Sequence, residues 1–216
     1  RVGHCTIDNE MHKTGVTVVL PCEDDIFKRK MVAAQHVLNG FGKTAGLMQI
    51  AELGTLESPI ALTNTLNVGL VHDAMVEYMV QRCEKDGVAM HSINPVVGEC
   101  NDSGLSNISV RAIGQAEVFA AIESACADFA EGDVGAGKGT ICHGLKGGIG
   151  SASRLIELDG KTSTLGVLVQ SNYGKLSVFT LCGKPMGAEI LEKQKLQDVD
   201  VDKGSIMMSV ATELPL

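Results

Sequence analysis

Residues 200–212 read DVDKGSIMMSVAT: a charged approach, one glycine, one serine and then a mostly apolar run. The apolar run predicts a buried β-strand that begins at Ser205. Gly204 allows the preceding peptide backbone angles that are closed to other residues. Ser205 therefore stands at a loop-to-strand junction, where a rigid backbone can hold its side chain still.

Ser205 has two interpretations. If the Gly204–Ser205 bond were cut, Ser205 would become an N-terminus, and its hydroxyl would lie beside its own α-amine. A free α-amine titrates near a pKa of about 7.7–8.0, so much of it can accept a proton near neutral pH. The alternative is an ordinary serine that opens a core strand, and composition alone favours this alternative.

The composition is that of one domain, residues 1–216, with a substantial core. Of the 216 residues, 44% are hydrophobic, 3% are aromatic and none is Trp, so aliphatic side chains and Met must build that core. The formal net charge of −8 argues against a nucleic-acid partner. No apolar run reaches the length of a membrane span and no signal peptide is evident. We therefore expect a cytoplasmic protein without a membrane partner.

The seven cysteines are scattered and form no C-x-x-C pair. An odd number of dispersed cysteines is typical of reduced thiols and predicts neither a disulfide frame nor a metal site. Asp198, Asp200 and Asp202 alternate before the Ser205 strand, and we interpret them as a solvated approach, since the rest of a calcium loop is absent.

The hydrophobic periodicity predicts a mixture of strands and helices. We expect strands within residues 2–20, 58–65, 95–100, 164–170 and 175–181, and helices at residues 27–38, 69–85, 117–130 and 187–196. Residues 171–174 (SNYG) predict a hairpin turn, which places Asn172 at the end of a buried strand. The mixed order predicts a layered α/β or α+β sandwich.

A glycine-rich tract covers residues 132–150. Residues 132–139 (GDVGAGKG) nearly match the phosphate-binding G-x-x-x-x-G-K-[ST] loop, but Gly139 replaces the hydroxyl residue and a helix precedes the motif. We therefore reject nucleotide binding, and residues 147–151 are too generic to indicate a dinucleotide site. Both stretches predict a close approach of backbone to other backbone or to a substrate.

Two further polar residues follow apolar strands, and each has two interpretations. Glu99 could neutralise a substrate ammonium group, or it could be a surface loop residue. Asn172 could donate to a developing oxyanion, an interaction worth about 2.7–4 kcal/mol in comparable sites, or it could satisfy a turn. The sequence leaves a Ser–His–Asp triad open, although no G-x-S-x-G elbow supports one.

Seven stretches together resemble the DmpA-type aminopeptidases, the L-aminopeptidase/D-esterase family that includes the β-peptidyl aminopeptidases. The stretches are RVGH (1–4), NGFGK (39–43), PIALTNT (59–65), PVVGE (95–99), KGGIGSASR (146–154), GVLVQSNYG (166–174) and GSI (204–206). They span nearly the whole chain in family order, and this co-occurrence is more specific than any single motif.

The resemblance implies a four-layer α/β/β/α sandwich, similar to the N-terminal-nucleophile hydrolases but with a different connectivity. It implies a self-processing serine hydrolase that is cut autocatalytically into an α-chain, residues 1–204, and a β-chain that starts at Ser205. Such enzymes release small N-terminal residues from peptides, amides or esters that carry a free amino group. They form homo-oligomers and need no cofactor or metal.

Matched position by position, the resemblance makes Ser205 the nucleophile, its freed amine the base and Asn172 the oxyanion-stabilising residue. Glu99 resembles the carboxylate that holds the substrate's amino group. Two departures stand out: Gly104 occupies a loop position where the family often has an aromatic residue, and the sequence stops at Leu216, before the Ser and the acidic residue that the family places beside the nucleophile. We therefore expect the domain to be incomplete at both ends.

Two rival functions remain at this stage. One is a non-catalytic small-molecule binding protein on the same fold, which would keep the pocket and Glu99 without cutting itself. The other is an acyltransferase similar to the ornithine acetyltransferases, which also cleave themselves. Those enzymes use threonine where this chain has Ser205, and this counts against the second rival.

Overall fold

The computed structural model describes residues 1–195 and 204–214. The strands in these ranges are β1 (Val2–Asp8), β2 (Lys13–Val19), β3 (Met31–Val32), β4 (Thr55–Leu56), β5 (Ile60–Asn64), β6 (Val96–Cys100), β7 (Ile141–Cys142), β8 (Leu145–Lys146), β9 (Gly148–Leu158), β10 (Lys161–Asn172) and β11 (Ser205–Thr212). The α-helices are α1 (Leu47–Leu53), α2 (Val68–Lys85), α3 (Gln115–Glu123) and α4 (Met186–Gln194). Short 3₁₀ turns include η1 (Thr65–Asn67), η3 (Gly135–Gly137) and η4 (Leu176–Val178).

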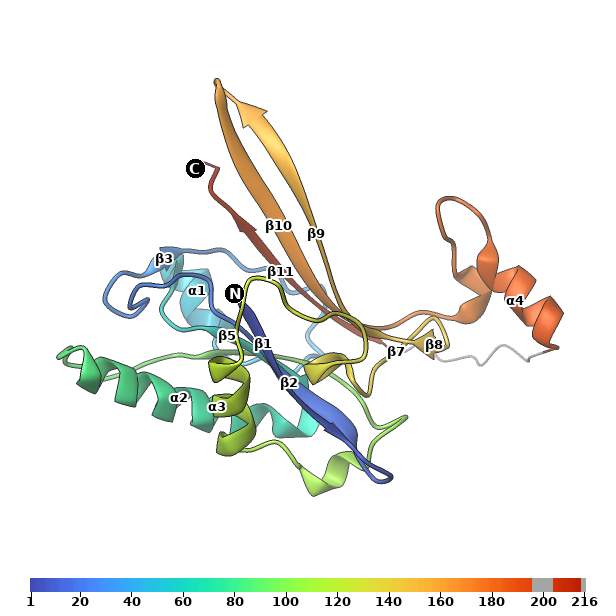
Figure 1. The fold of residues 1–216 in the computed structure, drawn as a ribbon, viewed down its shortest axis with the longest axis horizontal. Coiled ribbons are helices and arrows are strands. Elements are labelled where there is room, and N and C mark those ends of the chain that lie inside the picture. Colours follow the sequence, from blue (N-terminus) through green and yellow to red (C-terminus); the bar gives the residue numbers. More distant parts are fainter. Residues whose placement is uncertain (196–203, 215–216) are drawn as a thin grey trace.

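A four-stranded sheet with the order β1-β2-β5-β6 carries the first half of the chain. The β1–β2 hairpin confirms the prediction for residues 2–20, and Asn9 closes its turn by accepting the backbone N–H groups of Met11 and His12. β5 and β6 pair in parallel, so the chain must cross over between them, and α2 makes this crossover. Helices α2 and α3 cover one face of the sheet (Figure 1).

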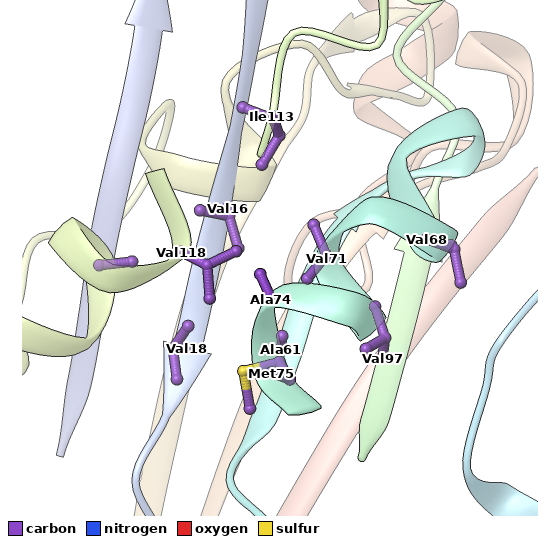
Figure 2. Packing of buried hydrophobic residues seen from close by; sticks show 11 residues of the cluster. Val16, Val18, Ala61, Val68, Val71, Ala74, Met75, Val97, Ile113 and Val118 are labelled. Carbon is purple, nitrogen blue, oxygen red and sulfur yellow. The ribbon is translucent and has the colours of Figure 1, made fainter. Parts of the chain in front are cut away.

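The main core lies between these helices and the sheet (Figure 2). Val16 and Val18 of β2 point at the helices, whose Met75 and Val118 are fully buried. The cluster is aliphatic, with methionine in place of aromatic rings, as the composition predicts. Burying one such side chain stabilises the fold by about 1.5–3 kcal/mol, so the cluster is the main source of stability for this half.

A second sheet has three long antiparallel strands in the order β11-β10-β9. It packs on the other face of the first sheet, where Leu62 meets Ile149 and Leu168 in a smaller buried cluster. Figure 1 shows its strands continuing well beyond the first sheet. The helices and the two sheets supply three of the four expected layers within the described residues, and the mixed, layered class is confirmed.

β11 begins at Ser205 as predicted, but the prediction that it is buried throughout is wrong. Met207 packs into the cluster between the sheets, whereas Met208 and Val210 are 61% and 63% exposed. Successive side chains of a strand point to opposite faces. β11 lies at an edge of its sheet, and in the described part of the chain only one of its faces is covered.

The predicted helix at residues 27–38 does not form. Asp25 accepts the backbone N–H groups of Phe27 and Lys28 in a turn, and the following residues pair as β3 with β4. Phe27 and Met31 still pack onto the core, but Val32 is 70% exposed. The apolar residues of this segment therefore belong to a packed turn and a short strand. A few buried side chains do not require a helix.

The helix predicted at residues 117–130 forms, but it is shorter. α3 ends at Glu123 because the next residues join the edge of β1. Ser124 Oγ donates to the carbonyl of His4, and Cys126 exchanges backbone hydrogen bonds with Val2. Tertiary pairing thus ends a helix that the sequence pattern would continue.

The predicted hairpin at residues 164–181 is wrong in its second half. β10 does end at Asn172, but its hairpin partner is the preceding β9, joined through Asp159 and Gly160. Residues 175–181 contain η4, and the buried Leu176 of η4 packs under α4. The apolar residues after Tyr173 therefore anchor α4 and do not extend the sheet.

The remaining predicted elements at residues 58–65, 69–85, 95–100 and 187–196 correspond to β5, α2, β6 and α4. All seven cysteines are free thiols in the structure. Asp198, Asp200, Asp202 and the predicted helix end at Leu196 lie outside the described residues. Within the described ranges, none of the helices combines the length and apolarity needed to cross a membrane.

Candidate functional site

The register between β10 and β11 brings two of the predicted site residues together. This antiparallel ladder runs from Leu165 opposite Thr212 to Asn172 opposite Ser205. Asn172 is thus the last residue of one strand and Ser205 is the first residue of the next. Asn172 Nδ2 donates a hydrogen bond to Ser205 Oγ at 3.1 Å.

A second donor reaches the same oxygen from the other sheet. The backbone N–H of Asn101, directly after β6, lies 3.3 Å from Ser205 Oγ. Two N–H groups from separate layers therefore converge on one half-buried hydroxyl. Fixed donors of this kind stabilise negative charge on the oxygen itself or on a neighbouring oxyanion, because they need no reorientation during the reaction.

The orientation of the Asn172 amide is fixed by a second backbone group. The N–H of Ile141, in β7, donates to Asn172 Oδ1 at 3.0 Å. Because an N–H donor can pair only with the carbonyl oxygen of the amide, Nδ2 is left facing Ser205. The glycine-rich tract therefore orients the side chain that contacts Ser205.

Cys100, beside this site, is unsuited to act as the nucleophile. Its side chain is fully buried, and its Sγ donates to the carbonyl of Gln170 at 3.6 Å. Burial raises the pKa of the Cys100 thiol to about 12, so the reactive thiolate is scarce at neutral pH. Ser205 is thus the better candidate for nucleophilic chemistry.

Glu99 lies in the same strand, but the structure does not bring it into hydrogen-bond contact with Ser205 or Asn172. Its carboxylate accepts the backbone N–H of Lys43 at 3.2 Å and the hydroxyl of Thr65. The side chain is only 5% exposed. Neighbouring residues of a strand point to opposite faces, and Cys100 faces the second sheet, so Glu99 points away from that sheet.

Asp102 is a buried acidic residue that the sequence did not indicate. Its Oδ2 accepts the Thr14 hydroxyl at 2.5 Å and Asn64 Nδ2 at 3.1 Å, and burial raises the pKa of its carboxyl group. Asp102 follows Asn101 directly. The network therefore ties the end of β6, and with it the Asn101 N–H, to the first sheet.

The glycine-rich tract behaves as predicted. A Cβ on Gly147 would lie 2.6 Å from the carbonyl oxygen of Ser171, and one on Gly137 would lie 2.5 Å from the backbone nitrogen of Ile149. Only glycine permits such a close approach of backbone to backbone. The same tract places Ile141 against Asn172.

Three groups of the candidate site were not predicted from the sequence. They are the N–H groups of Asn101 and Ile141 and the carboxyl group of Asp102. The first two act through the backbone, so the identity of the side chain carries no signal. A cavity of about 220 Å³ is lined by the loop after β2, by α2 and by Arg1, Pro59 and Ile122, but not by Ser205, Asn172 or Glu99. In the described ranges, no cluster of three or more His, Cys, Asp or Glu could hold a metal ion.

The chain is similar to several known proteins along its whole length. It is 34% identical to the β-peptidyl aminopeptidase BapA of Sphingosinicella xenopeptidilytica, with all of this chain and 58% of that protein covered. Its structure resembles that of the PH0078 protein from Pyrococcus horikoshii OT3, with a TM-score of 0.89, 43% identity, and all of this chain and 61% of that one covered.

A further similar structure is the L-aminopeptidase D-Ala-esterase/amidase from Ochrobactrum anthropi, with a TM-score of 0.86 and 33% identity. All of this chain and 61% of that one are covered. That protein is described as a prototype for the serine aminopeptidases and as a variant of the Ntn hydrolase fold. The chain thus spans about three fifths of the length of these relatives. Because peptidase family S58 also matches residues 1–216 in full, this chain belongs to that family.

Proposed function

We propose that the protein is a self-processing serine aminopeptidase that also acts on amides and esters. The observation that carries this proposal is the convergence of Asn172 Nδ2 and the Asn101 N–H on Ser205 Oγ, one residue after Gly204. Cleavage of the Gly204–Ser205 bond gives Ser205 a free α-amine next to its hydroxyl. One residue then supplies both the nucleophile and the base.

In the proposed reaction, Ser205 Oγ attacks the substrate carbonyl and its hydroxyl proton passes to the α-amine. The two N–H groups stabilise the oxyanion of the tetrahedral intermediate. The intermediate collapses when the ammonium returns the proton to the leaving nitrogen or oxygen. Water then attacks the acyl-serine, again with the amine as base, and releases the acyl product. None of these steps requires a cofactor.

Glu99 is the proposed anchor for the substrate's free amino group. A carboxylate offers about four acceptor sites, and the bonds from Lys43 and Thr65 occupy two of them. The names of the relatives, β-peptidyl aminopeptidase and L-aminopeptidase D-Ala-esterase/amidase, support a substrate with such a group. We also propose a cytoplasmic homo-oligomer, and the seven free cysteines support a reducing compartment.

The test is the intact mass of the full-length protein after prolonged incubation, with and without Ser205→Ala. The expected result is two fragments that separate at Gly204/Ser205 in the wild type, one uncut chain in the variant, and no turnover of aminoacyl amides by the variant. A single uncut wild-type species that binds but does not hydrolyse these compounds would indicate the binding-protein alternative. Turnover retained by Ser205→Ala would refute the role of Ser205.

A further inference from the structure

Lys146, in β8, has an ammonium group that no carboxylate contacts at hydrogen-bond distance within the described ranges. Its Nζ donates instead to three backbone carbonyls, those of Gly137 at 2.8 Å, Thr140 at 3.2 Å and Gly147 at 2.8 Å. Lys146 is exposed as a residue, yet its ammonium turns back onto these three carbonyls, which take all three of its N–H donors. A group that water could solvate is thus directed at one stretch of backbone, so this position calls for an explanation.

One of these carbonyls leads directly to the candidate site. The carbonyl of Thr140 and the N–H of Ile141 belong to the same peptide group. Lys146 donates to the carbonyl end of this group, and the N–H end donates to Asn172 Oδ1 at 3.0 Å. The amide of Asn172 then donates through Nδ2 to Ser205 Oγ at 3.1 Å. The chain from the ammonium to Ser205 contains two amide groups, and every hydrogen bond points the same way.

We propose that Lys146 is a positioning residue that polarises the Asn172 amide through the Thr140–Ile141 peptide and thereby strengthens the donor that faces Ser205. This inference rests on the proposed function, because it assigns a role within that reaction. A positive charge at the carbonyl end draws electron density from the peptide N–H, which becomes a stronger donor to Asn172. The same effect then passes through the Asn172 amide to Nδ2, because hydrogen bonds in such a chain polarise one another.

The geometry of the β7–β8 hairpin supports a specific contact between Lys146 and the Thr140–Ile141 peptide, and not a general effect of positive charge near the site. Ile141 and Lys146 lie directly opposite each other in the β7–β8 ladder. The Thr140 carbonyl also accepts the N–H of Gly147 at 2.9 Å, and Thr140 is fully buried. The peptide that links Lys146 to Asn172 is therefore held by two donors at one end and one acceptor at the other.

This relay, the chain of hydrogen bonds from Lys146 to Ser205, should depend on pH, because only the ammonium form of Lys146 polarises the Thr140–Ile141 peptide. Burial lowers the pKa of Lys146, Asp133 raises it and the charge of Lys138 lowers it. Lys146 therefore loses its proton at a lower pH than an ordinary lysine. We expect kcat to fall as the pH rises through this pKa.

The test compares Lys146→Met with Lys138→Met in the full-length protein. Lys138 lies in the same tract, but its ammonium binds the carboxylates of Asp8 and Asp133 and takes no part in the chain to Ser205. For Lys146→Met we expect kcat and the self-cleavage rate to fall about tenfold with little change in KM, because a donor is weakened and not removed. Lys138→Met should leave both rates within about twofold, because neither of its ion pairs contacts the chain of hydrogen bonds to Ser205.

The pH profile separates polarisation from simple support of the loop. The alkaline fall in kcat should be present in the wild type and in Lys138→Met and absent in Lys146→Met. Lys146→Arg keeps the charge and should lose less activity than Lys146→Met. An unchanged kcat in Lys146→Met, or an alkaline fall that persists in that variant, would overturn the proposal.

A second measurement needs neither activity nor a folded variant. In the wild-type protein, the ¹⁵N shift of the Asn172 side-chain amide should titrate with the same midpoint as the Lys146 side chain. Separate midpoints contradict the relay even if the protein cleaves itself. Matching midpoints in a protein that neither cleaves itself nor hydrolyses amides would leave the relay standing and refute the proposed function.

Discussion

The two sheets of this protein differ in how they are covered. The four-stranded sheet has helices on one face and the second sheet on the other, and its central side chains Val16, Val18 and Val97 are fully buried. In the three-stranded sheet, by contrast, Leu155 and Met208 are 75% and 61% exposed. The candidate site lies where the two sheets meet: the covered sheet provides the Asn101 N–H, and the open sheet provides Ser205 and Asn172.

This difference implies a division of labour. The covered sheet should contribute most of the free energy of unfolding, whereas the open sheet contributes the two side chains of the proposed site. Removing buried atoms from the covered sheet or its helices should therefore lower the free energy of unfolding. Changes at the seam, where Ser205 and Asn172 of the open sheet meet the Asn101 N–H, should lower the reaction rate with little effect on the free energy of unfolding.

A Met→Ala substitution, made once in the core of the covered sheet and once on the exposed face of the open sheet, should give the largest difference in the free energy of unfolding. Met75→Ala removes a fully buried side chain from the helix–sheet core and should cost about 2–5 kcal/mol in the free energy of unfolding. Met208→Ala removes an exposed side chain and should cost less than about 0.5 kcal/mol. Denaturant unfolding of the full-length variants measures both values. Equal losses would contradict this difference between the two sheets.

At the seam, Asn172→Ala should act on rate and not on stability. Loss of this proposed oxyanion donor should lower kcat about 10²- to 10³-fold, or about 2.7–4 kcal/mol. The matched control is Thr212→Ala at the far end of the same ladder, where Thr212 Oγ bonds the carbonyl of Thr164. Steady-state kinetics and thermal unfolding should show a large kcat effect for the first variant only. A similar kcat loss in both variants would assign the effect to the strand pairing.

Gly204 offers a smaller effect at the same seam. A Cβ at this position would lie 2.6 Å from Tyr173 Cβ, so the backbone before Ser205 has to shift in Gly204→Ala. We expect self-cleavage to slow by about ten- to a hundredfold, since small displacements of reacting groups carry large rate costs. Gly166→Ala is the control, because its Cβ would meet the nearest atom only at 3.9 Å. Gel analysis of fresh protein over time measures the two rates, and equal rates would contradict this steric argument.

Local sequence patterns predicted the covered sheet better than the open one. α2 repeats its apolar residues over five turns, and the pattern is legible because one face is buried throughout. The hairpin partner of β10 was misplaced because residues 175–181 are apolar for another reason, the packing of Leu176 under α4. The placement of Ser205 and Asn172 at strand ends was predictable from the apolar runs beside them. The Asn101 and Ile141 contacts were not, because they use backbone atoms that every residue shares.

The smallest expected effect concerns Asp102, which ties the seam to the covered sheet. Burial raises the pKa of its carboxyl group above the value of about 3.9 in an unfolded chain. The folded state therefore binds this proton more tightly than the unfolded state does. The contribution of Asp102 to stability is greatest below the unfolded pKa and is lost as the pH rises through the folded pKa.

Unfolding measured between pH 4 and pH 7 should show this loss in the wild type, on the order of 1 kcal/mol for each unit by which the pKa is raised. Asp102→Asn cannot titrate, so that part of the slope should be absent, whatever the absolute stability of the variant. Glu117→Gln, which removes the α3 carboxylate that accepts the Gly114 N–H, is the control and should retain the slope. A slope that is identical in the wild type and Asp102→Asn would show that the carboxyl group is solvated, and the Asn101 N–H would then lack this anchor.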